Sequence, residues 1–372
     1  MKYKLKEIGE IISGGTPSTK RSDFYATKGI GWITPKDLSN YHKKYICHGA
    51  RDISKIGLDN SSAKIMPPNS ILVSSRAPIG YVAMAEESLA TNQGFKSIIP
   101  DVSKVLPDYL YYLMLNSKSK LEQVASGSTF KEVSGKTMAN FEVDIPEIQK
   151  QKYIISLLNP IVKKIELNNQ INDNLDALLT TIFEKQINNK SFKEANLTDI
   201  ATYKNGLAMQ KYRPKNNEKS LPVLKIRELN QGHTDDSSDR CSIKIDKNVI
   251  VNIGDIIFSW SGTLLVKNWS GKRAGLNQHL FKVTSNSYPD WFIYEWTKYY
   301  LRKFQSIAAG KATTMGHIKR SDLKSSKVRI PNESKLVELN TIMQPLYDKR
   351  IEVIKENQQL IELKQVLLQK FF

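Results

Sequence analysis

The segment from Pro160 to Glu184 reads PIVKKIELNNQINDNLDALLTTIFE, and its apolar residues recur at spacings of three and four. The segment from Pro345 to Phe371 reads PLYDKRIEVIKENQQLIELKQVLLQKF and has the same spacing. The polar interruptions of these stripes are Lys164, Asn168, Arg350, Asn357 and Lys364. A heptad-like stripe predicts a long helix that pairs with another helix. Because proline is tolerated in a first helical turn, we expect each helix to begin or bend at its proline.

Both predicted helices carry more apolar surface than a single helix pair needs, since a second apolar line flanks each stripe. We expect this extra face to contact a partner, although packing on the helices' own domains would also occupy it. The 25 residues from Pro160 to Glu184 would span roughly 37 Å, close to one turn of duplex DNA. The residues expected to serve helix pairing and partner docking are Ile161, Ile165, Ile171, Leu175, Leu178, Leu179, Leu346, Val353, Ile354, Leu360, Ile361, Leu367 and Leu368.

The remainder of the sequence is duplicated. Asn92-Gln93 returns as Asn277-Gln278, and Ile145-Pro146 returns as Ile330-Pro331, both after 185 residues (277 − 92 = 330 − 145 = 185). Gly14 has a counterpart in Gly206. A repeated unit of this length is a whole domain with its helix, not a solenoid repeat.

Secondary-structure signals follow the same duplication. The strand-like run 70–75 matches 255–260, and the aromatic helix 108–116 matches 290–300. The chain is therefore predicted to be of the α+β class, with two tandem mixed domains that are each followed by a long helix. The expected boundaries are 1–146 for the first domain, 147–190 for its helix, 191–331 for the second domain and 332–372 for its helix.

The net charge of +18 points to an anionic partner. Duplex nucleic acid is the first candidate, and an anionic membrane surface is the second, but no basic amphipathic surface helix is evident. No apolar run predicts a membrane span, and Met1 to Lys6 leads into none, so no signal peptide is expected. Cys47 and Cys241 are expected to be unpaired thiols of a cytoplasmic protein.

Catalytic, cofactor and metal motifs are missing from the sequence. Ser134-Gly135-Lys136-Thr137 matches the end of a phosphate-binding loop, but position 130 is Phe130 where that loop needs glycine. We therefore expect a binding protein without cofactor or metal. Two alternatives stay open, a self-sufficient DNA methyltransferase or nuclease with a recognition domain, and a helical scaffold whose charge only keeps it in solution.

Five sequence marks occur in a fixed order. They are 13–18 (SGGTPS), 76–80 (RAPIG), 92–94 (NQG), 127–129 (GST) and Ile145-Pro146. In this order, and with a diverged second copy, the whole chain resembles the specificity subunit of a type I restriction–modification enzyme.

The resemblance implies a division of labour. Each domain would be a target-recognition domain that grips one half of a bipartite DNA site, and the helices would form an antiparallel coiled coil that measures the gap. Two methyltransferase subunits would dock on the helices, and motor-nuclease (restriction) subunits would complete the assembly. The chain itself would catalyse nothing.

Candidate DNA contacts are hydroxyl, amide and basic side chains in turns and at strand ends, with one tryptophan, where such groups contact phosphates and base edges. In the first domain they are Ser13, Thr16, Ser18, Lys20, Arg21, Lys36, Ser75, Arg76, Asn92, Gln93, Ser128, Thr129 and Lys131. In the second domain they are Lys204, Gln210, Lys211, Arg213, Arg227, Trp260, Ser261, Asn277, Gln278, Lys311, Thr313, Thr314, His317 and Lys319.

Two of these assignments, and the role of the aromatic helices, have competing interpretations. Arg76 would contact a guanine edge in a bidentate manner, or instead a phosphate or a carboxylate of its own domain. The recurring Asn-Gln pair would read adenine, but bracing a loop is the favoured interpretation. The aromatic helices around Tyr109–Tyr112 and Trp291–Trp296 are interpreted as core rather than as base-stacking surfaces.

Overall fold

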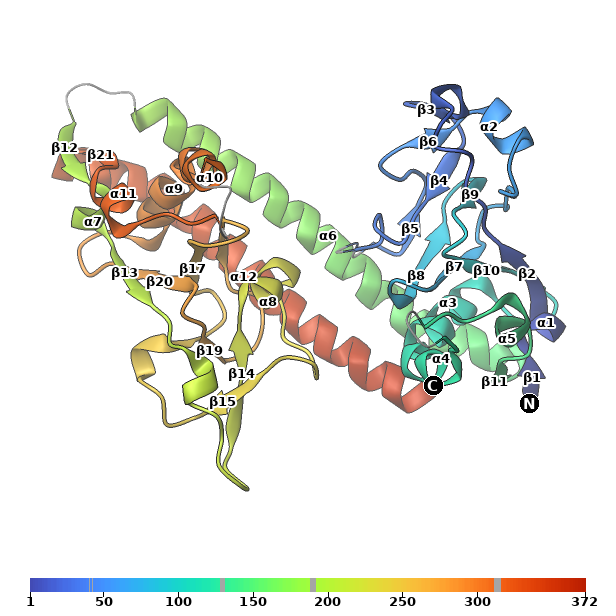
Figure 1. Cartoon of the computed structure of the whole chain (residues 1–372). Coiled ribbons are helices and arrows are strands. Elements are labelled where there is room, and N and C mark those ends of the chain that lie inside the picture. The colour runs from blue at the N-terminus through green and yellow to red at the C-terminus, as the bar shows by residue number, and fades with distance from the viewer. Residues whose placement is uncertain (40, 42, 128–130, 188–191, 311–315) are drawn as a thin grey trace. The chain divides into compact units, whose positions relative to one another are not determined.

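The computed structural model describes residues 1–372 except 40, 42, 128–130, 188–191 and 311–315. The described residues form two compact units. The first unit comprises Met1–Glu166 with Glu362–Phe372, and the second comprises Leu167–Ile361. Each unit joins a mixed α/β domain to part of both long helices, α6 (Ile148–Ile187) and α12 (Glu333–Phe371) (Figure 1).

The first unit is built on a sheet of strand order β2-β10-β7-β8-β5. The smaller pairs β1-β11, β3-β6 and β4-β9 complete its strands among the described residues. Its elements before α6 are β1 (Lys2–Lys4), α1 (Leu5–Ile8), β2 (Gly9–Ser13), η1 (Ser22–Phe24), β3 (Tyr25–Ala26), β4 (Gly31–Ile33), β5 (Tyr45–Ile46), β6 (Asp52–Ile53), α2 (Lys55–Asp59), β7 (Ile71–Ser75), β8 (Ile79–Ala85), β9 (Leu89–Thr91), β10 (Lys96–Pro100), α3 (Pro107–Asn116), α4 (Lys118–Val124), α5 (Gly135–Ala139) and β11 (Glu142–Asp144).

The second unit is built on a sheet of order β13-β20-β17-β18. A second sheet has the order β15-β14-β19-β16, and β12 pairs with β21. Its elements between the long helices are β12 (Lys193–Asn196), α7 (Leu197–Ile200), β13 (Thr202–Asn205), η2 (Met209–Lys211), β14 (Ser220–Leu224), α8 (Ile226–Gln231), β15 (Arg240–Ser242), η3 (Lys247–Val249), β16 (Ile250–Val251), β17 (Ile256–Ser259), β18 (Leu265–Asn268), β19 (Ala274–Leu276), β20 (Leu280–Thr284), α9 (Asp290–Tyr299), α10 (Leu301–Ala309), α11 (Arg320–Lys324) and β21 (Lys327–Ile330).

The duplication read from the sequence is present in the topology. The order β2-β10-β7-β8 has its counterpart in β13-β20-β17-β18, and the pair β1-β11 has its counterpart in β12-β21. The parallel pair β4-β9 likewise corresponds to the parallel pair β14-β19. The predicted α+β class with two tandem mixed domains is confirmed, and Cys47 and Cys241 are both free thiols.

An aromatic helix forms the centre of each core. In α3, Tyr109 and Tyr112 are 2% and 0% exposed, and Tyr109 packs 5.1 Å (ring centroids) from Phe372, which directly follows α12. In α9, Trp291 and Trp296 are equally buried, and Trp296 lies 5.1 Å from the ring of Phe183 in α6. The interpretation of these aromatic residues as core is confirmed.

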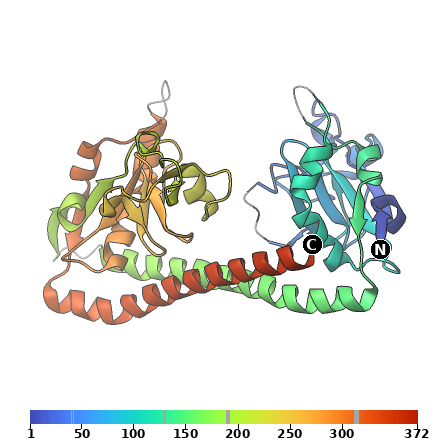
Figure 2. The same cartoon turned by 90° about the horizontal axis from the view of Figure 1, so that it is seen from below.

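The long helices contact one another in opposite directions within the second unit (Figure 2). Asn168 donates to the carboxylate of Glu356 at 2.8 Å, and further along α6 Asp176 lies 3.3 Å from Arg350. Rising numbers on α6 thus meet falling numbers on α12, which makes the contact antiparallel. Of the five polar interruptions of the stripes, Asn168, Arg350 and Asn357 are buried in this contact, whereas Lys164 is exposed and Lys364 is half-buried.

The expectation that a helix begins at its proline is wrong for both long helices. Pro160 and Pro345 both lie inside their helices, each 12 residues after the first helical residue (160 − 148 = 345 − 333 = 12). The helices have 40 and 39 residues, so each is roughly 60 Å long rather than the roughly 37 Å inferred above. The match to one turn of DNA therefore loses its basis.

The expected pairing residues divide into three sets. Leu179, Val353 and Leu368 are buried, whereas Ile171 and Leu178 are 40% and 45% exposed and so lie away from the helix contact. The half-buried remainder comprises Ile161, Ile165, Leu175, Leu346, Ile354, Leu360, Ile361 and Leu367.

A buried carboxyl group lies where α9 meets the long helices. Glu295 is 1% exposed, and its Oε2 accepts a hydrogen bond from the Thr180 hydroxyl at 3.0 Å. Its Oε1 has no partner among the described residues. Burial raises the pKa of Glu295 to about 7, against the opposing effect of the Lys298 charge.

Glu295 should make the stability of the protein depend on pH. The folded state binds this proton more tightly than the unfolded chain, so the free energy of unfolding should fall as pH rises from about 4.5 to about 7. We expect Glu295→Gln to match the wild type near pH 4.5 and to exceed it by up to about 3 kcal/mol at pH 8. Urea titrations at both pH values measure this, with exposed Glu338→Gln as the control. An equal effect at both pH values would refute the assignment.

Candidate nucleic-acid interface

A glycine loop follows the first strand of the main sheet in each unit. Its backbone lies so close to the Asn-Gln turn that a Cβ on Gly14 would be 1.9 Å from the carbonyl oxygen of Asn92. A Cβ on Gly206 would be 2.3 Å from the carbonyl oxygen of Asn277. Corresponding hydrogen bonds close both loops, from Gly15 N to Thr91 O and from Leu207 N to Leu276 O, each at 2.9 Å. Gly14 and Gly206 therefore occupy equivalent positions in the two units.

The recurring asparagine braces the turn that it begins. Asn92 Oδ1 accepts a hydrogen bond from Gly94 N at 2.9 Å, and Asn277 Oδ1 accepts one from His279 N at 3.2 Å. The favoured interpretation, that these asparagines brace a loop, is confirmed for both. Gln93 is exposed and is hydrogen-bonded by the hydroxyl of Thr16.

A third backbone arrangement recurs where the strands β7 and β17 end. The amide of Ser75 donates to Gly94 O at 2.7 Å, and the amide of Trp260 donates to His279 O at 3.4 Å. The carbonyl of Ser75 accepts from Val133 N at 3.0 Å, and that of Trp260 accepts from Ile318 N at 3.1 Å. All of these partners are 185 residues apart (260 − 75 = 279 − 94 = 318 − 133 = 185).

These contacts bring separate segments together in what we call the strand-end cluster. In the first unit it comprises residues 75–76, 92–96 and 131–134, and in the second unit 260–261, 277–281 and 316–319. The sequence marks of the glycine loop, the Asn-Gln turn and the strand end, quoted separately above, therefore lie in one place.

The side chains on the two clusters differ in character. In the first, Glu132 lies 3.1 Å from Arg76 and 3.5 Å from Lys96, whose ammonium also donates to the Gln93 carbonyl. In the second, the ring of Trp260 lies 5.8 Å from those of His279 and Phe281 and 6.4 Å from that of His317 (centroid distances). A charged cluster in one unit thus corresponds to an aromatic one in the other.

Three residues that were predicted to contact DNA have buried side chains, so the prediction is wrong for them. Ser75 is 0% exposed, and its hydroxyl donates to the carbonyl of Gly94 at 3.1 Å. Ser261 and Asn277 are 3% and 6% exposed, since both sit inside the second strand-end cluster. None of these side chains is available to a phosphate.

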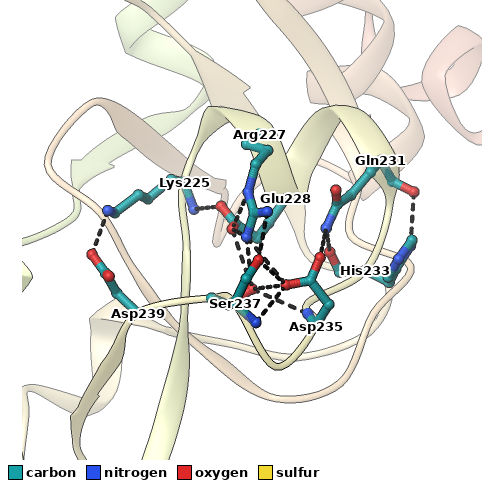
Figure 3. Close-up of polar contacts among 9 residues, drawn as sticks. Lys225, Arg227, Glu228, Gln231, His233, Asp235, Ser237 and Asp239 are labelled. Carbon is teal, nitrogen blue, oxygen red and sulfur yellow. Dashed lines mark hydrogen bonds and ion pairs between the residues drawn. The ribbon is translucent and has the colours of Figure 1, made fainter. Parts of the chain in front are cut away.

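The guanidinium of Arg227 is hydrogen-bonded to other residues of its own domain (Figure 3). Its guanidinium donates twice to Glu228, at 2.6 and 2.9 Å, and also contacts Asp235, Ser237 and Ser238. Burial raises the pKa of Asp235, but the hydrogen bond from Ser237 and the charge of Arg227 outweigh it and lower the value to about 2. Arg227 is thus a loop brace with most of its donors engaged.

The other predicted contacts are accessible to different degrees. Lys204 pairs with Asp246 at 3.4 Å, and Arg21 pairs with Asp23 at 2.5 Å. The exposed ones are Ser13, Ser18, Lys20, Arg21, Lys36, Gln93, Lys131, Lys204, Gln210, Lys211, Arg213 and Lys319, and the half-buried ones are Thr16, Arg76, Gln278, Trp260 and His317. Ser128, Thr129, Lys311, Thr313 and Thr314 lie outside the described residues.

Lys96 and Glu132 were not predicted from the sequence. Each looks like an ordinary charged residue beside a strand or turn. The signal that would have found them is the 185-residue offset, which places Phe281 and His317 at the same positions.

Comparison with known proteins gives a consistent result. A family model described as the type I restriction modification DNA specificity domain matches residues 1–177 and 189–364. The chain is 31% identical over 404 residues to the type I restriction enzyme MjaIX specificity subunit of Methanocaldococcus jannaschii, covering 99% of this chain and 91% of that protein. It is 30% identical over 190 residues to the HindI specificity subunit of Haemophilus influenzae, covering 49% and 40%.

The fold also matches a solved structure. The crystal structure of a type I restriction–modification S subunit from M. genitalium aligns with 100% of this chain and 96% of that one, with a TM-score of 0.53 and 14% sequence identity. Among the described residues, no helix is long and apolar enough to cross a membrane.

The two loop glycines should not tolerate a side chain. We expect Gly14→Ala and Gly206→Ala each to lower the free energy of unfolding by about 1–3 kcal/mol, because the new Cβ overlaps a backbone carbonyl. Gly310→Ala is the control, since the nearest atoms to its Cβ are 3.7 Å away. Urea unfolding of the full chain measures all three variants. If Gly14→Ala and Gly310→Ala unfolded alike, the close approach would be disproved.

Proposed function

The chain belongs to the family of type I restriction–modification DNA specificity subunits, and we propose on this premise that its two domains bind the two halves of a bipartite DNA target. It is a non-catalytic recognition subunit that acts on DNA together with the other subunits of such a system. A self-sufficient methyltransferase or nuclease is not favoured.

The assignment of one half-site to each domain rests on the strand-end clusters. Their backbone hydrogen bonds coincide at a constant offset, whereas Arg76, Lys96 and Glu132 give way to Ser261, Phe281 and His317. A shared backbone presents both sets of side chains in the same way, and different side chains select different bases. Two unlike half-sites are therefore the expected target.

Exposed basic side chains of both domains supply the binding energy that does not depend on sequence. Lysine and arginine contacts to phosphate position a protein on the duplex and release bound counterions. We assign this role to Lys36, Lys131, Lys211, Arg213 and Lys319, which are all exposed. A DNA substrate places the working protein in the cytoplasm.

We further propose that α6 and α12 set the number of unread base pairs between the half-sites. Their antiparallel contact is held by paired polar groups, Asn168 with Glu356 and Asp176 with Arg350. These pairs fix the register of the helices, so a change of helix length should change the gap and nothing else.

Removing matched heptads tests this ruler. Deleting residues 169–175 from α6 and 351–357 from α12 removes Glu356 but keeps the pair of Asp176 with Arg350, which still fixes the register. Each helix becomes shorter by roughly 10 Å, or about three base pairs of duplex. We expect the preferred gap to shrink by about that amount while both half-site sequences stay the same. Selection from randomised duplexes reports both quantities, and inserting one heptad in each helix should lengthen the gap. Altered half-sites with an unaltered gap would eliminate the ruler.

Methyltransferase subunits are proposed to dock on an exposed apolar stripe of α6. Leu167, Ile171 and Leu178 are spaced by four and seven residues, so they share one helix face, and all are at least 40% exposed. The sequence placed the extra apolar face at Ile165 and Leu179 and assigned Ile171 and Leu178 to the pairing stripe, so the exposed stripe differs from the expected one. Motor-nuclease subunits would join through the methyltransferases.

Polar substitutions in the stripe should weaken this docking. We expect the double variant Ile171→Ser/Leu178→Ser to bind its methyltransferase subunit about tenfold or more weakly, because docking buries both side chains. Thermal melting should be nearly unchanged, since both residues are exposed in the free chain. Titration with the methyltransferase subunit measures the affinity, and Ile56→Ser/Ile65→Ser is the matched control. Equal affinities of the two double variants would rule out the stripe.

A further inference from the structure

We propose that Arg76, held by Glu132 and Lys96, reads a guanine in the half-site of the first domain, and that the second domain lacks this mode of recognition. This inference rests on the proposed function, in which each domain reads one half-site.

Arg76 is placed by backbone before any side chain acts. It directly follows β7, and its neighbour Ser75 is hydrogen-bonded on both sides, through its amide to Gly94 and through its carbonyl to Val133. Its side chain is 37% exposed. The guanidinium is therefore anchored at its base and accessible at its tip, which suits a group that enters a groove.

The positioning residues leave Arg76 with free donors and surplus charge. Its Nη1 donates to Glu132 Oε2 at 3.1 Å, and the other Glu132 oxygen lies 3.5 Å from the ammonium of Lys96. A guanidinium has five N–H donors, and a bidentate contact with O6 and N7 of guanine needs two. The cluster contains three cations, Arg76, Lys96 and Lys131, and one carboxylate, so it carries two net positive charges, which favours approach to a polyanion.

The equivalent positions of the second domain cannot make this contact. At the offset of 185, Arg76 corresponds to Ser261, Lys96 to Phe281 and Glu132 to His317. Ser261 is 3% exposed, and the ring of Trp260 occupies the neighbourhood with His279 and Phe281. The guanidinium, its carboxylate and its ammonium are thus replaced together, on the same backbone.

A purely structural ion pair is the competing explanation, and it makes a different prediction. A brace would lower stability when broken and leave base preference untouched. A reader would alter preference at one position of one half-site, and its carboxylate partner would alter the same position.

The test is selection of randomised bipartite duplexes by the full chain. We expect Arg76→Lys, which keeps the charge but loses bidentate geometry, to reduce the guanine preference at one position of one half-site by about tenfold or more. Glu132→Gln should reduce preference at the same position by a smaller factor. The other half-site should be unaffected in both variants. Arg51→Lys is the matched control, because Arg51 is exposed and stacks on Tyr25 outside the cluster.

Different results of this selection would refute the proposed function and the reading role of Arg76. If the wild type enriched no pair of separated sequence blocks, the proposed function itself would fail. If the wild type enriched such blocks and Arg76→Lys retained every base preference, only the reading role of Arg76 would be refuted. Thermal melting checks folding, and if Arg76→Lys is destabilised, the nearly isosteric Glu132→Gln variant decides by the same criterion.

Discussion

In both halves of the chain, a backbone carbonyl occupies the space where the side chain of residue 14 or residue 206 would have to be. Only glycine allows this approach, and the approach brings the first sheet strand against the Asn-Gln turn. The carbonyl groups of this turn accept a hydrogen bond from the amide of Ser75, the last residue of β7, or from that of Trp260, which directly follows β17. The position of the strand-end cluster is therefore determined by backbone contacts, and the side chains that it displays are free to differ.

The register of the two long helices depends on a buried charge. Arg350 is only 8% exposed, and a buried guanidinium without partners would cost several kcal/mol. It is satisfied by Asn268 of β18 at 2.5 Å, by the hydroxyl of Tyr294 in α9 at 2.7 Å and by Asp176 of α6. An apolar seam tolerates a slip of one turn, but a slip would leave Arg350 unpaired. The polar interruptions of the heptad stripe thus specify register rather than weaken the pairing.

The sequence predicts the architecture well because duplication is visible without any knowledge of contacts. A helix start at the proline was one of two expectations, and it was wrong because Pro160 follows the buried residues Ile154 and Leu158, which already lie at helical spacing. At the interface, Asn92 was recognised as a brace, but Ser75 was not recognised as buried. A hydroxyl after a strand looks the same in sequence whether it faces solvent or a carbonyl. Glu132 could not be recognised either, because its partners Arg76 and Lys96 are brought to it by folding alone.

The two clusters also indicate how such a domain can change what it reads. Arg76 is 37% exposed, so its replacement leaves little unsatisfied, but Lys96 is only 10% exposed and depends on Glu132 for its neighbouring charge. Replacing Glu132 alone leaves the largely buried ammonium of Lys96 without its neighbouring carboxylate, which is costly. Replacing both with aromatic groups, as at Phe281 and His317, removes the cost entirely. Specificity on this backbone should therefore change by coupled substitutions at the lysine and glutamate positions, with the arginine position free to vary by itself.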